Sequence, residues 1–259
     1  MDILSQIFAE RREAVKTARR SLPLDALREA AAGRVHHSLA GRLAEPGLHI
    51  IAEMKKASPS AGLLRPEYDP RGIAGQYLRS GACAISVLTE PAHFLGSLDD
   101  LRAVRVVVDI PILRKDFMCD VYQVYEAAAA GADVILLIVA GLDESLAGEL
   151  HAAAREVGLD VLVESHTEDE LAAALRLDGA ILGVNSRCLK TLTTDLAVAR
   201  RLAAMIPPGR VAVAESGIHT RDEIVNLQGH GYRGVLIGEA LMSEGDAGAK
   251  LRELLGRPA

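Results

Sequence analysis

Residues 51–60, IAEMKKASPS, are typical of the end of a β-strand that runs into a turn. Because side chains alternate along a strand, Glu53 and Lys55 share one face. Ala52 and Met54 lie on the opposite, apolar face, which suits a packed helix. The first face carries a carboxylate and an ammonium two residues apart in an otherwise apolar strand, where burying either charge alone is costly. We therefore expect a fold in which the end of this strand faces other polar groups.

Short apolar runs of the same kind occur eight times between residues 48 and 238, with helix-like segments between them. Successive runs begin about 20 to 35 residues apart, which is the length of one strand–helix unit. Eight such units with near-continuous apolar strands fit a closed parallel barrel better than an open sheet. The runs are LHIIAEMK (48–55), CAISVLT (83–89), PILRKDF (111–117), DVILLIVA (133–140), DVLVES (160–165), AILGVN (180–185), RVAVAES (210–216) and GVLIG (234–238).

Signals for helix starts and ends fall between these runs. Asp69 before Pro70 predicts an N-cap followed by proline at the first helical position. Three Ser/Thr–acidic pairs resemble capping boxes, and two glycines predict helix ends. The pairs are Ser97 with Asp100, Thr167 with Glu170, and Thr220 with Glu223, and the glycines are Gly131 and Gly158.

We predict a single α/β domain over residues 1–259, a (β/α)8 TIM barrel with an N-terminal helical extension over 1–47. Two helical patterns, 3–19 and 24–32, occupy the extension, and RREAVKTARR (11–20) is interpreted as a solvated helix face. The alternative is a doubly wound open sheet. It is disfavoured because no G-x-G-x-x-G sequence follows the first run.

The composition excludes several classes of protein. The chain is 49% hydrophobic and 25% charged, and its net charge of −6 argues against nucleic-acid binding, which favours basic patches. It has no run of about 18 apolar residues, so no membrane-spanning segment is expected. Cys83, Cys119 and Cys188 form neither a disulfide framework nor a CxxC motif, which indicates a cytoplasmic protein. Glu164 and His166 lack a third ligand at metal spacing, so no metal is predicted.

Polar or ionisable residues end six of the eight runs. In a (β/α)8 barrel the carboxyl ends of all strands open at one mouth, where the catalytic groups of such enzymes lie. Lysine, glutamate, asparagine and arginine converging there predict an anionic substrate and proton transfer. The strand-end residues are Lys55, Thr89–Glu90, Lys115, Glu164, Asn185 with Arg187, Glu215–Ser216 and, after the last run, Gly238.

Glycine turns follow the last two runs, in AESGI (214–218) and LIGEALM (236–242). Barrels of this kind often bind phosphate there, with backbone N–H groups and the start of a short helix. Gly217 and Gly238 would let the backbone approach a phosphate closely. EALM (239–242) is predicted as the first turn of that helix. A phosphorylated small molecule is therefore the expected substrate.

Eight motifs, taken in order along the chain, resemble the indole-3-glycerol phosphate synthase family, and the N-terminal extension is also similar. The resemblance implies a (β/α)8 barrel that closes the indole ring of 1-(2-carboxyphenylamino)-1-deoxyribulose 5-phosphate, with release of carbon dioxide and water. It implies no cofactor. The motifs are IAEMKKASPSAG (51–62), ILRKDF (112–117), YQVYEA (122–127), GADVILLI (131–138), VLVESH (161–166), GVNSRCLKT (183–191), AESGI (214–218) and LIGEALM (236–242).

The resemblance also implies catalytic roles. Lys115 would protonate the ribulose carbonyl oxygen during ring closure, and we expect burial beside other cations to lower its pKa. Glu164 would be the acid/base group of the later dehydration. Lys55 would bind phosphate and is a second candidate proton donor, with Glu53 as its charged neighbour.

Further residues are implied to contact the substrate. One group would hold its carboxylate and hydroxyls, a second would form the slot for the aromatic ring, and a third would bind phosphate. The first group is Ser58, Asn185 (also placed among the catalytic residues) and Arg187; the second is Pro59, Phe94, Phe117, Leu136, Leu189 and Leu192; the third is Lys55, Ser216, Gly217, Gly238 and the backbone of Glu239. Glu215 is predicted as a further substrate contact.

The sequence departs from the usual family pattern at three places. VNSR (184–187) replaces the commoner NNR, Ser165 stands where valine is usual, and Leu192 stands where phenylalanine is usual. None of these departures removes a group with an assigned role in proton transfer. We expect them to reshape the wall of the pocket.

Three alternatives stay open at this point. Another phosphosugar barrel such as phosphoribosylanthranilate isomerase is one, although its acid/base pair is a cysteine and an aspartate, whereas the first run here ends in Lys55. A Schiff-base aldolase using Lys55 or Lys115 is the second. An inactive barrel that acts as a binding protein is the third. We expect a monomer or a weak homodimer.

Overall fold

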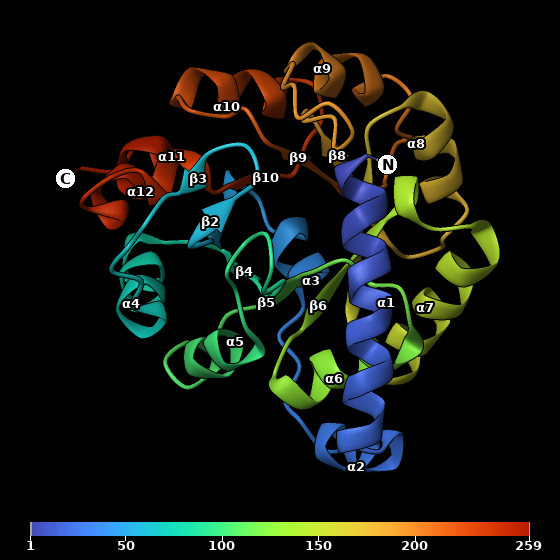
Figure 1. Cartoon of the computed structure of the whole chain (residues 1–259). Coiled ribbons are helices and arrows are strands. Elements are labelled where there is room, and N and C mark those ends of the chain that lie inside the picture. The colour runs from blue at the N-terminus through green and yellow to red at the C-terminus, as the bar shows by residue number, and fades with distance from the viewer. Residues whose placement is uncertain (1, 259) are drawn as a thin grey trace.

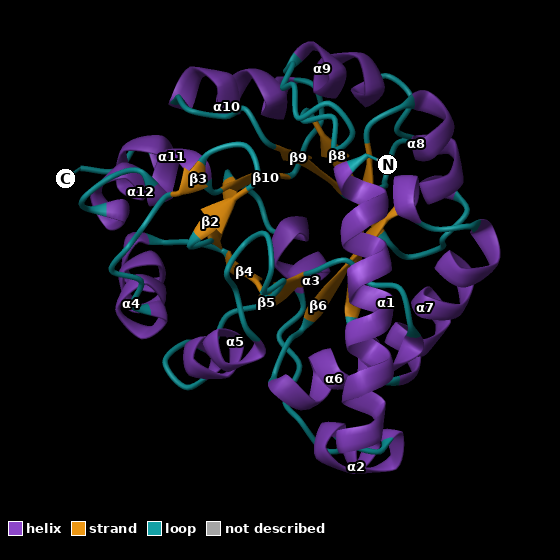
Figure 2. Cartoon of the chain, viewed as in Figure 1, coloured by secondary structure: helices purple, strands orange, loops and turns teal. Residues whose placement is uncertain are grey.

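Eight parallel strands close into a barrel in the computed structural model, which describes residues 2–258. The strands follow the order β1-β10-β9-β8-β7-β6-β5-β4, and β4 pairs with β1 to close the ring. Helices surround the ring on the outside (Figures 1 and 2). The prediction of a (β/α)8 barrel is therefore confirmed.

Each barrel strand lies within one of the eight predicted runs. The strands are buried along almost their whole length, because helices cover the outer face and side chains fill the interior. Their near-continuous apolar sequences follow from this double burial. The strands are β1 (His49–Met54), β4 (Ala84–Leu88), β5 (Ile112–Lys115), β6 (Val134–Ile138), β7 (Asp160–Ser165), β8 (Ile181–Asn185), β9 (Ala212–Glu215) and β10 (Gly234–Ile237).

Four of the helices that follow barrel strands, α4, α5, α8 and α10, begin at the predicted caps. The side chain of Asp69 accepts a hydrogen bond from the Arg71 N–H, and Pro70 is the first helical residue. Of the three predicted capping boxes, Thr220 with Glu223 forms both bonds, so the other two pairs are corrected to simple N-caps. The helices are α4 (Pro70–Ser80), α5 (Leu98–Arg105), α6 (Val121–Ala130), η1 (Val139–Gly141), α7 (Glu144–Glu156), α8 (Glu168–Leu175), α9 (Ala197–Ala203), α10 (Arg221–Gly229), α11 (Glu239–Met242) and α12 (Ala247–Leu255).

The N-terminal extension forms three helices, α1 (Ile3–Ser21), α2 (Leu24–Ala31) and α3 (Leu39–Ala44), of which the sequence predicted the first two. The capping side chain of Ser38, which accepts from the Gly41 N–H, was the missed signal for α3. Figure 1 shows α1 in dark blue running along one side of the barrel past α6.

The interpretation of residues 11–20 as a solvated helix face is wrong in part. The Arg11 side chain is only 11% exposed and pairs with the buried carboxylate of Asp116 at 2.8 Å. Arg19 forms an ion pair with Asp120 at the start of α6. A basic pattern on a helix does not reveal whether acidic side chains from distant strands will meet it, and here they do.

The loop after β1 contains a feature that the sequence did not predict. Ala57–Ser58 (β2) and Gly62–Leu63 (β3) pair as a two-stranded antiparallel ribbon. This ribbon holds Ser58 and its neighbours beside the carboxyl ends of the barrel strands. None of the helices between residues 2 and 258 combines the length and the apolar character that crossing a membrane requires.

Candidate active site

Two adjoining cavities lie at the carboxyl ends of the strands, with volumes of about 100 Å³ and 40 Å³. They share Glu53, Lys55, Lys115, Arg187 and Ser216. The larger cavity is otherwise lined mainly by apolar side chains. The smaller is enclosed by the turns after β9 and β10. A charged centre therefore separates an apolar slot from a pocket of glycine turns.

Every predicted site residue except Glu215 lines one of these cavities. Strand alternation explains the convergence of Glu53, Lys115, Leu136, Glu164 and Asn185, which lie on the inward face of their strands, and the loops that follow the strands supply the other residues. In the larger cavity the predicted residues are Glu53, Lys55, Ser58, Pro59, Phe94, Lys115, Phe117, Leu136, Glu164, Asn185, Arg187, Leu189, Leu192 and Ser216, and the smaller adds Gly217, Gly238 and Glu239.

Lys115 lies at the centre of the charged group. Its Nζ atom is 2.5 Å from Glu215 Oε2 and 3.4 Å from Glu164 Oε2. Burial by itself favours the neutral amine, but Glu215 and two further carboxylates outweigh burial and raise the pKa of Lys115. The expectation of a lowered pKa is therefore wrong in this structure, because the nearest neighbours of the ammonium are anions rather than cations.

Glu215 is the predicted substrate contact that lies outside both sets of lining residues. It is fully buried beneath Lys115, and a Cβ atom at Gly183 would come within 2.4 Å of its Oε1. Among the described residues this Oε1 atom has no hydrogen-bond partner. Burial raises the pKa of Glu215 from 4.5 to about 7, since the opposing effect of Lys115 is partly cancelled by Glu164. Glu215 thus holds Lys115 from below.

Glu53 and Lys55 form the second ion pair of the centre. Their side chains are 2.7 Å apart, which satisfies the two charges that the first strand places on its inward face. Burial acts to raise the pKa of Glu53, but Lys55 and Lys115 outweigh it and the pKa is lowered. Gly238 is required beside this pair because a Cβ atom there would lie 2.3 Å from Glu53 Oε1.

Asn185 and Arg187 connect the two cavities. Asn185 Nδ2 donates to Glu164 Oε1 at 2.9 Å, while Asn185 Oδ1 accepts from the Arg187 N–H. The Arg187 guanidinium donates to Ser60 Oγ at 2.7 Å and to Glu239 Oε2 at 2.9 Å. This hydrogen bond from Arg187 lowers the pKa of Glu239. A substrate carboxylate at Arg187 would therefore meet a guanidinium that is already oriented.

The wall of the apolar slot includes residues that the sequence did not reveal. Ile3, Leu4 and Ile7 of α1 line the larger cavity. The ring of Phe117 lies edge-on to Phe8 of the same helix, with centroids 5.7 Å apart, and 6.0 Å from the ring of Phe94. The apolar stripe of α1 was visible as a pattern, but not the surface that it covers. Ser60, Leu88, Asp116 and Ile138 were missed in the same cavity, and Ile218, His219, Leu236, Ile237 and Ala240 in the smaller one.

The turn after β9 has an unusual backbone. Ser216 and Gly217 both have positive φ values, 66° and 75°. A serine in this left-handed region carries strain, which proteins retain mainly at binding or catalytic sites. The turn directs the chain back along the smaller cavity, where α11 begins after Gly238.

Of the three departures from the usual family pattern, Leu192 lines the larger cavity. It does so with a positive φ of 60°. Ser165 is buried on the outward face of β7 and donates to the Gly183 carbonyl at 3.0 Å. Ser186 is buried as well, and both serines lie outside the two sets of lining residues. The expected reshaping of the wall therefore concerns Leu192.

Two solved structures of other enzymes share this architecture. Thiamine phosphate pyrophosphorylase from Pyrococcus furiosus is 19% identical with a TM-score of 0.59, and the match covers 84% of this chain and 96% of that one. The tryptophan synthase α subunit from Legionella pneumophila is 15% identical with a TM-score of 0.58, over 80% and 91% of the two chains. At these identities the likeness shows the barrel fold alone.

The whole-chain sequence matches are closer. A protein named indole-3-glycerol phosphate synthase from Rhodospirillum rubrum is 47% identical over 261 residues, which is 98% of this chain and 99% of its own. One of the same name from Dehalococcoides mccartyi is 45% identical over 258 residues, 98% and 100% of the two chains. The profile of the indole-3-glycerol phosphate synthases matches residues 4–254, which includes every residue of both cavities except Ile3. By sequence over its whole length and by the barrel that carries the site, the chain belongs to the indole-3-glycerol phosphate synthase family.

Proposed function

We propose that this protein closes the indole ring of 1-(2-carboxyphenylamino)-1-deoxyribulose 5-phosphate, giving indole-3-glycerol phosphate, carbon dioxide and water. One observation carries the proposal: the apolar slot and the glycine-turn pocket meet at Lys55 and Lys115. The substrate has the same order of parts, with an aromatic ring at one end, a ketone in the middle and a phosphate at the other end.

Binding at both ends would position the reacting atoms. The ring would lie between Phe94, Phe117 and the α1 side chains, and the phosphate would meet the backbone of the Ser216–Gly217 turn together with Lys55. Phosphate held far from the reacting carbons supplies binding energy that orients the ring against the ketone. Arg187 would hold the substrate carboxylate, because its planar guanidinium matches a carboxylate in a two-point contact.

Ring closure needs an acid on the ketone oxygen as negative charge builds there. Lys115 is the proposed donor, and its raised pKa keeps the proton in place until that charge develops. The ring-closed intermediate is an iminium ion that withdraws the electron pair released with carbon dioxide. In the decarboxylation the protein therefore only has to hold the intermediate in the correct orientation.

The last step removes water and needs a base and an acid on opposite parts of one small molecule. Glu164 is the proposed group, held by the hydrogen bond from Asn185 and 3.4 Å from the Lys115 ammonium. This short distance lets a carboxylate and an ammonium serve the same intermediate. Asn185 fixes the carboxylate by occupying Oε1, which leaves Oε2 directed toward Lys115.

The decisive experiment is incubation of the purified protein with the carboxyphenylamino substrate, with indole fluorescence as the readout. Fluorescence that rises with turnover supports the proposal. Tight binding without turnover would instead favour the inactive-barrel alternative. Trapping of a covalent lysine adduct by borohydride would favour an aldolase-type Schiff base at Lys55 or Lys115.

Two further expectations accompany this function. We propose a cytoplasmic protein, supported by three thiols that are free in the structure. We also propose a monomer or a weak homodimer, because the described barrel supplies all the residues of both cavities from one chain. Sedimentation over a range of protein concentrations tests the second expectation.

A further inference from the structure

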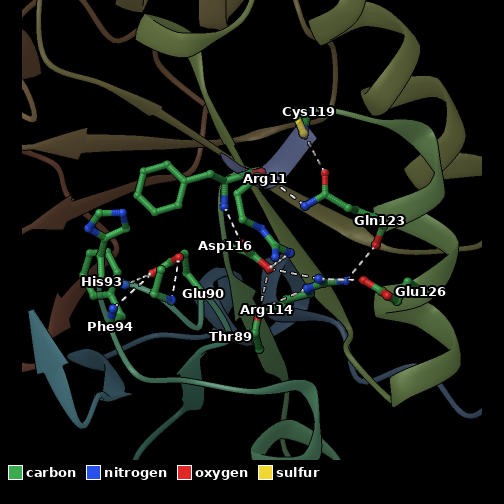
Figure 3. A network of polar contacts seen from close by, with 12 residues as sticks. Arg11, Thr89, Glu90, His93, Phe94, Arg114, Asp116, Cys119, Gln123 and Glu126 are labelled. Atoms are coloured by element: carbon green, nitrogen blue, oxygen red, sulfur yellow. Dashed lines mark hydrogen bonds and ion pairs between the residues drawn. The ribbon is translucent and has the colours of Figure 1, made fainter. Parts of the chain in front are cut away.

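The turn after β4 is built around one carboxylate, that of Glu90, which is only 1% exposed. Its Oε1 atom accepts from the Ala92 N–H at 2.9 Å. Its Oε2 atom accepts from the N–H groups of His93 at 2.7 Å and Phe94 at 3.0 Å. Figure 3 shows the carboxylate directed into the loop that carries His93 and Phe94. Three backbone donors thus depend on a single side chain.

The remainder of this turn is equally constrained. Leu95 has a φ of 54°, which is uncommon for a bulky residue, and the Gly96 N–H donates back to the Glu90 carbonyl at 3.0 Å. A Cβ atom at Gly96 would lie 2.1 Å from the Leu88 carbonyl oxygen. The backbone of this turn is therefore tightly restricted in conformation. The Glu90 carboxylate holds the three residues at its apex, 92–94.

The same loop connects three walls of the apolar slot. Phe94 lines the slot, and its carbonyl accepts from the Ala57 N–H at 3.2 Å, next to Ser58 in the ribbon after β1. His93 Nε2 lies 2.8 Å from Glu10 Oε2 on α1, the helix whose Ile3, Leu4 and Ile7 line the slot. The wall after β4, the wall after β1 and the α1 wall therefore meet at residues 93 and 94.

Thr89, at the start of the loop, ties it to the strand of Lys115. Its hydroxyl donates to Asp116 Oδ2 at 2.8 Å, and the same oxygen accepts from Arg11 and Arg114 (Figure 3). The Arg114 and Asp116 side chains are fully buried. The base of the loop is thus fixed by a buried network, while the backbone N–H groups of residues 92–94 at its apex are held by the Glu90 carboxylate.

We infer that Glu90 is a positioning residue for the aromatic end of the substrate, acting through Phe94 without lining either cavity. The inference rests on the proposed function for the identity of the ligand. Removing the negative charge weakens three backbone hydrogen bonds at once, and the amide of a glutamine turns a donor toward other donors. The backbone at residues 92–94 then becomes less constrained. The Phe94 ring is held less firmly in its position in the wall of the slot.

The expected consequence is confined to one end of the ligand. Glu90→Gln raises the KM of the carboxyphenylamino substrate roughly tenfold, the effect of one lost charge-assisted hydrogen bond, and leaves kcat within about threefold. Titration calorimetry shows a matching loss of affinity for indole-3-glycerol phosphate. The affinity for glycerol 3-phosphate, which occupies the phosphate pocket alone, stays unchanged.

Glu170→Gln is the matched control. Glu170 also caps a turn after a barrel strand, since its Oε2 accepts from the His166 N–H at 2.7 Å, but His166 lies outside the two cavities. This variant keeps the wild-type KM. If Glu90→Gln fails to fold, Glu90→Asp, which keeps the charge at shorter reach, supplies the test with a KM increase of about threefold.

Several outcomes overturn the inference: an unchanged KM in a folded Glu90 variant, an equal loss of affinity for glycerol 3-phosphate, or the same KM increase in Glu170→Gln. A wild-type protein that binds indole-3-glycerol phosphate but does not turn over the substrate overturns the proposed function alone. The calorimetric comparison of the Glu90 variants then still decides the inference.

Discussion

A carboxylate is buried at each end of the barrel, and the two carboxylates differ in their hydrogen-bond partners. At the amino-terminal end, Asp133 accepts from four donors: Arg34, Arg105 and the N–H groups of His37 and Ile112. At the mouth, Glu215 meets Lys115 through one oxygen, and among the described residues its other oxygen has no partner. Both side chains are buried, so the contrast lies in their partners and not in their exposure.

This contrast distinguishes a carboxylate that stabilises the fold from carboxylates that lie in the candidate active site. Asp133 joins the N-terminal extension, the end of α5 and the start of β5 at one point, and every bond it makes is internal to the fold. At the mouth, Glu53, Glu164 and Glu215 share the ammonium groups of Lys55 and Lys115. A buried group left without a full set of partners is costly, and such groups collect where a ligand or a reaction uses them.

Lys115→Ala tests the mouth most directly and has the largest expected effect. Turnover falls by roughly 10²- to 10⁴-fold, which is the usual contribution of a positioned general acid. The fold survives, because burial raises the pKa of Glu215 to about 7, so this carboxylate can take up a proton when the ammonium is removed. Steady-state kinetics and a thermal melt measure both effects. Near-normal turnover in this variant would eliminate Lys115 as the acid.

Asp133→Asn tests the amino-terminal end of the barrel. Here we expect stability to fall while kcat is unchanged. The amide directs a donor at N–H and guanidinium donors, so the free energy of unfolding falls by about 3–5 kcal/mol, as for a buried ion pair that loses one partner. The kcat of the folded fraction stays at the wild-type value, because Asp133 lies at the other end of the strands. Urea unfolding and activity at low temperature provide the two measurements. A kcat that falls with stability would contradict the separation of the two ends.

Glu164→Gln separates ring closure from the final dehydration, the two steps assigned to different residues at the mouth of the barrel. Glutamine keeps an oxygen for the Asn185 amide but cannot exchange a proton, so the final loss of water slows by roughly tenfold or more while ring closure proceeds. Single-turnover experiments with quenched samples would show the ring-closed, decarboxylated intermediate accumulating. An unchanged single-turnover profile would assign the dehydration to another group.

Glu215→Gln gives the smallest effect, a change in the pH dependence of stability. The pKa of Glu215 is raised from 4.5 to about 7, so its stabilising contribution is complete below pH 4.5 and is lost as the pH rises through 7. The free energy of unfolding of the wild type should therefore decline between these values relative to the variant. The pKa of Glu53 is lowered, so Glu53 changes the pH dependence of stability only below this pH range. Parallel stability curves for the two proteins between pH 4.5 and 7 would refute the raised pKa.

Much of the architecture was predictable from the sequence because its causes are local. Each barrel strand matches an apolar run, and the caps at Asp69 and Thr220 form as their side chains dictate. The convergence of Lys55, Lys115 and Glu164 follows from strand alternation together with the parallel order of the strands.

The residues that escaped prediction depend on contacts between distant segments. Arg11 looked like one of several surface arginines, and only folding places it on Asp116, 105 residues away along the chain. The pKa of Lys115 was expected to fall, but the sequence does not say that its nearest neighbours are carboxylates of β7 and β9. The α1 side chains in the slot were missed for the same reason. The β2–β3 ribbon was missed although it is local, since it pairs Ala57 with Leu63 and Ser58 with Gly62.

The sequence by itself determined the barrel, the order of its strands and the set of charged groups at its mouth. Hydrophobic periodicity and capping act over a few residues, so they can be read along the chain. Only the tertiary structure decided which charges pair, which carboxylate keeps an unpartnered oxygen and which helix completes the slot. Pairing energies depend on distances of a few ångströms and on burial, and both are set by segments that the sequence leaves far apart.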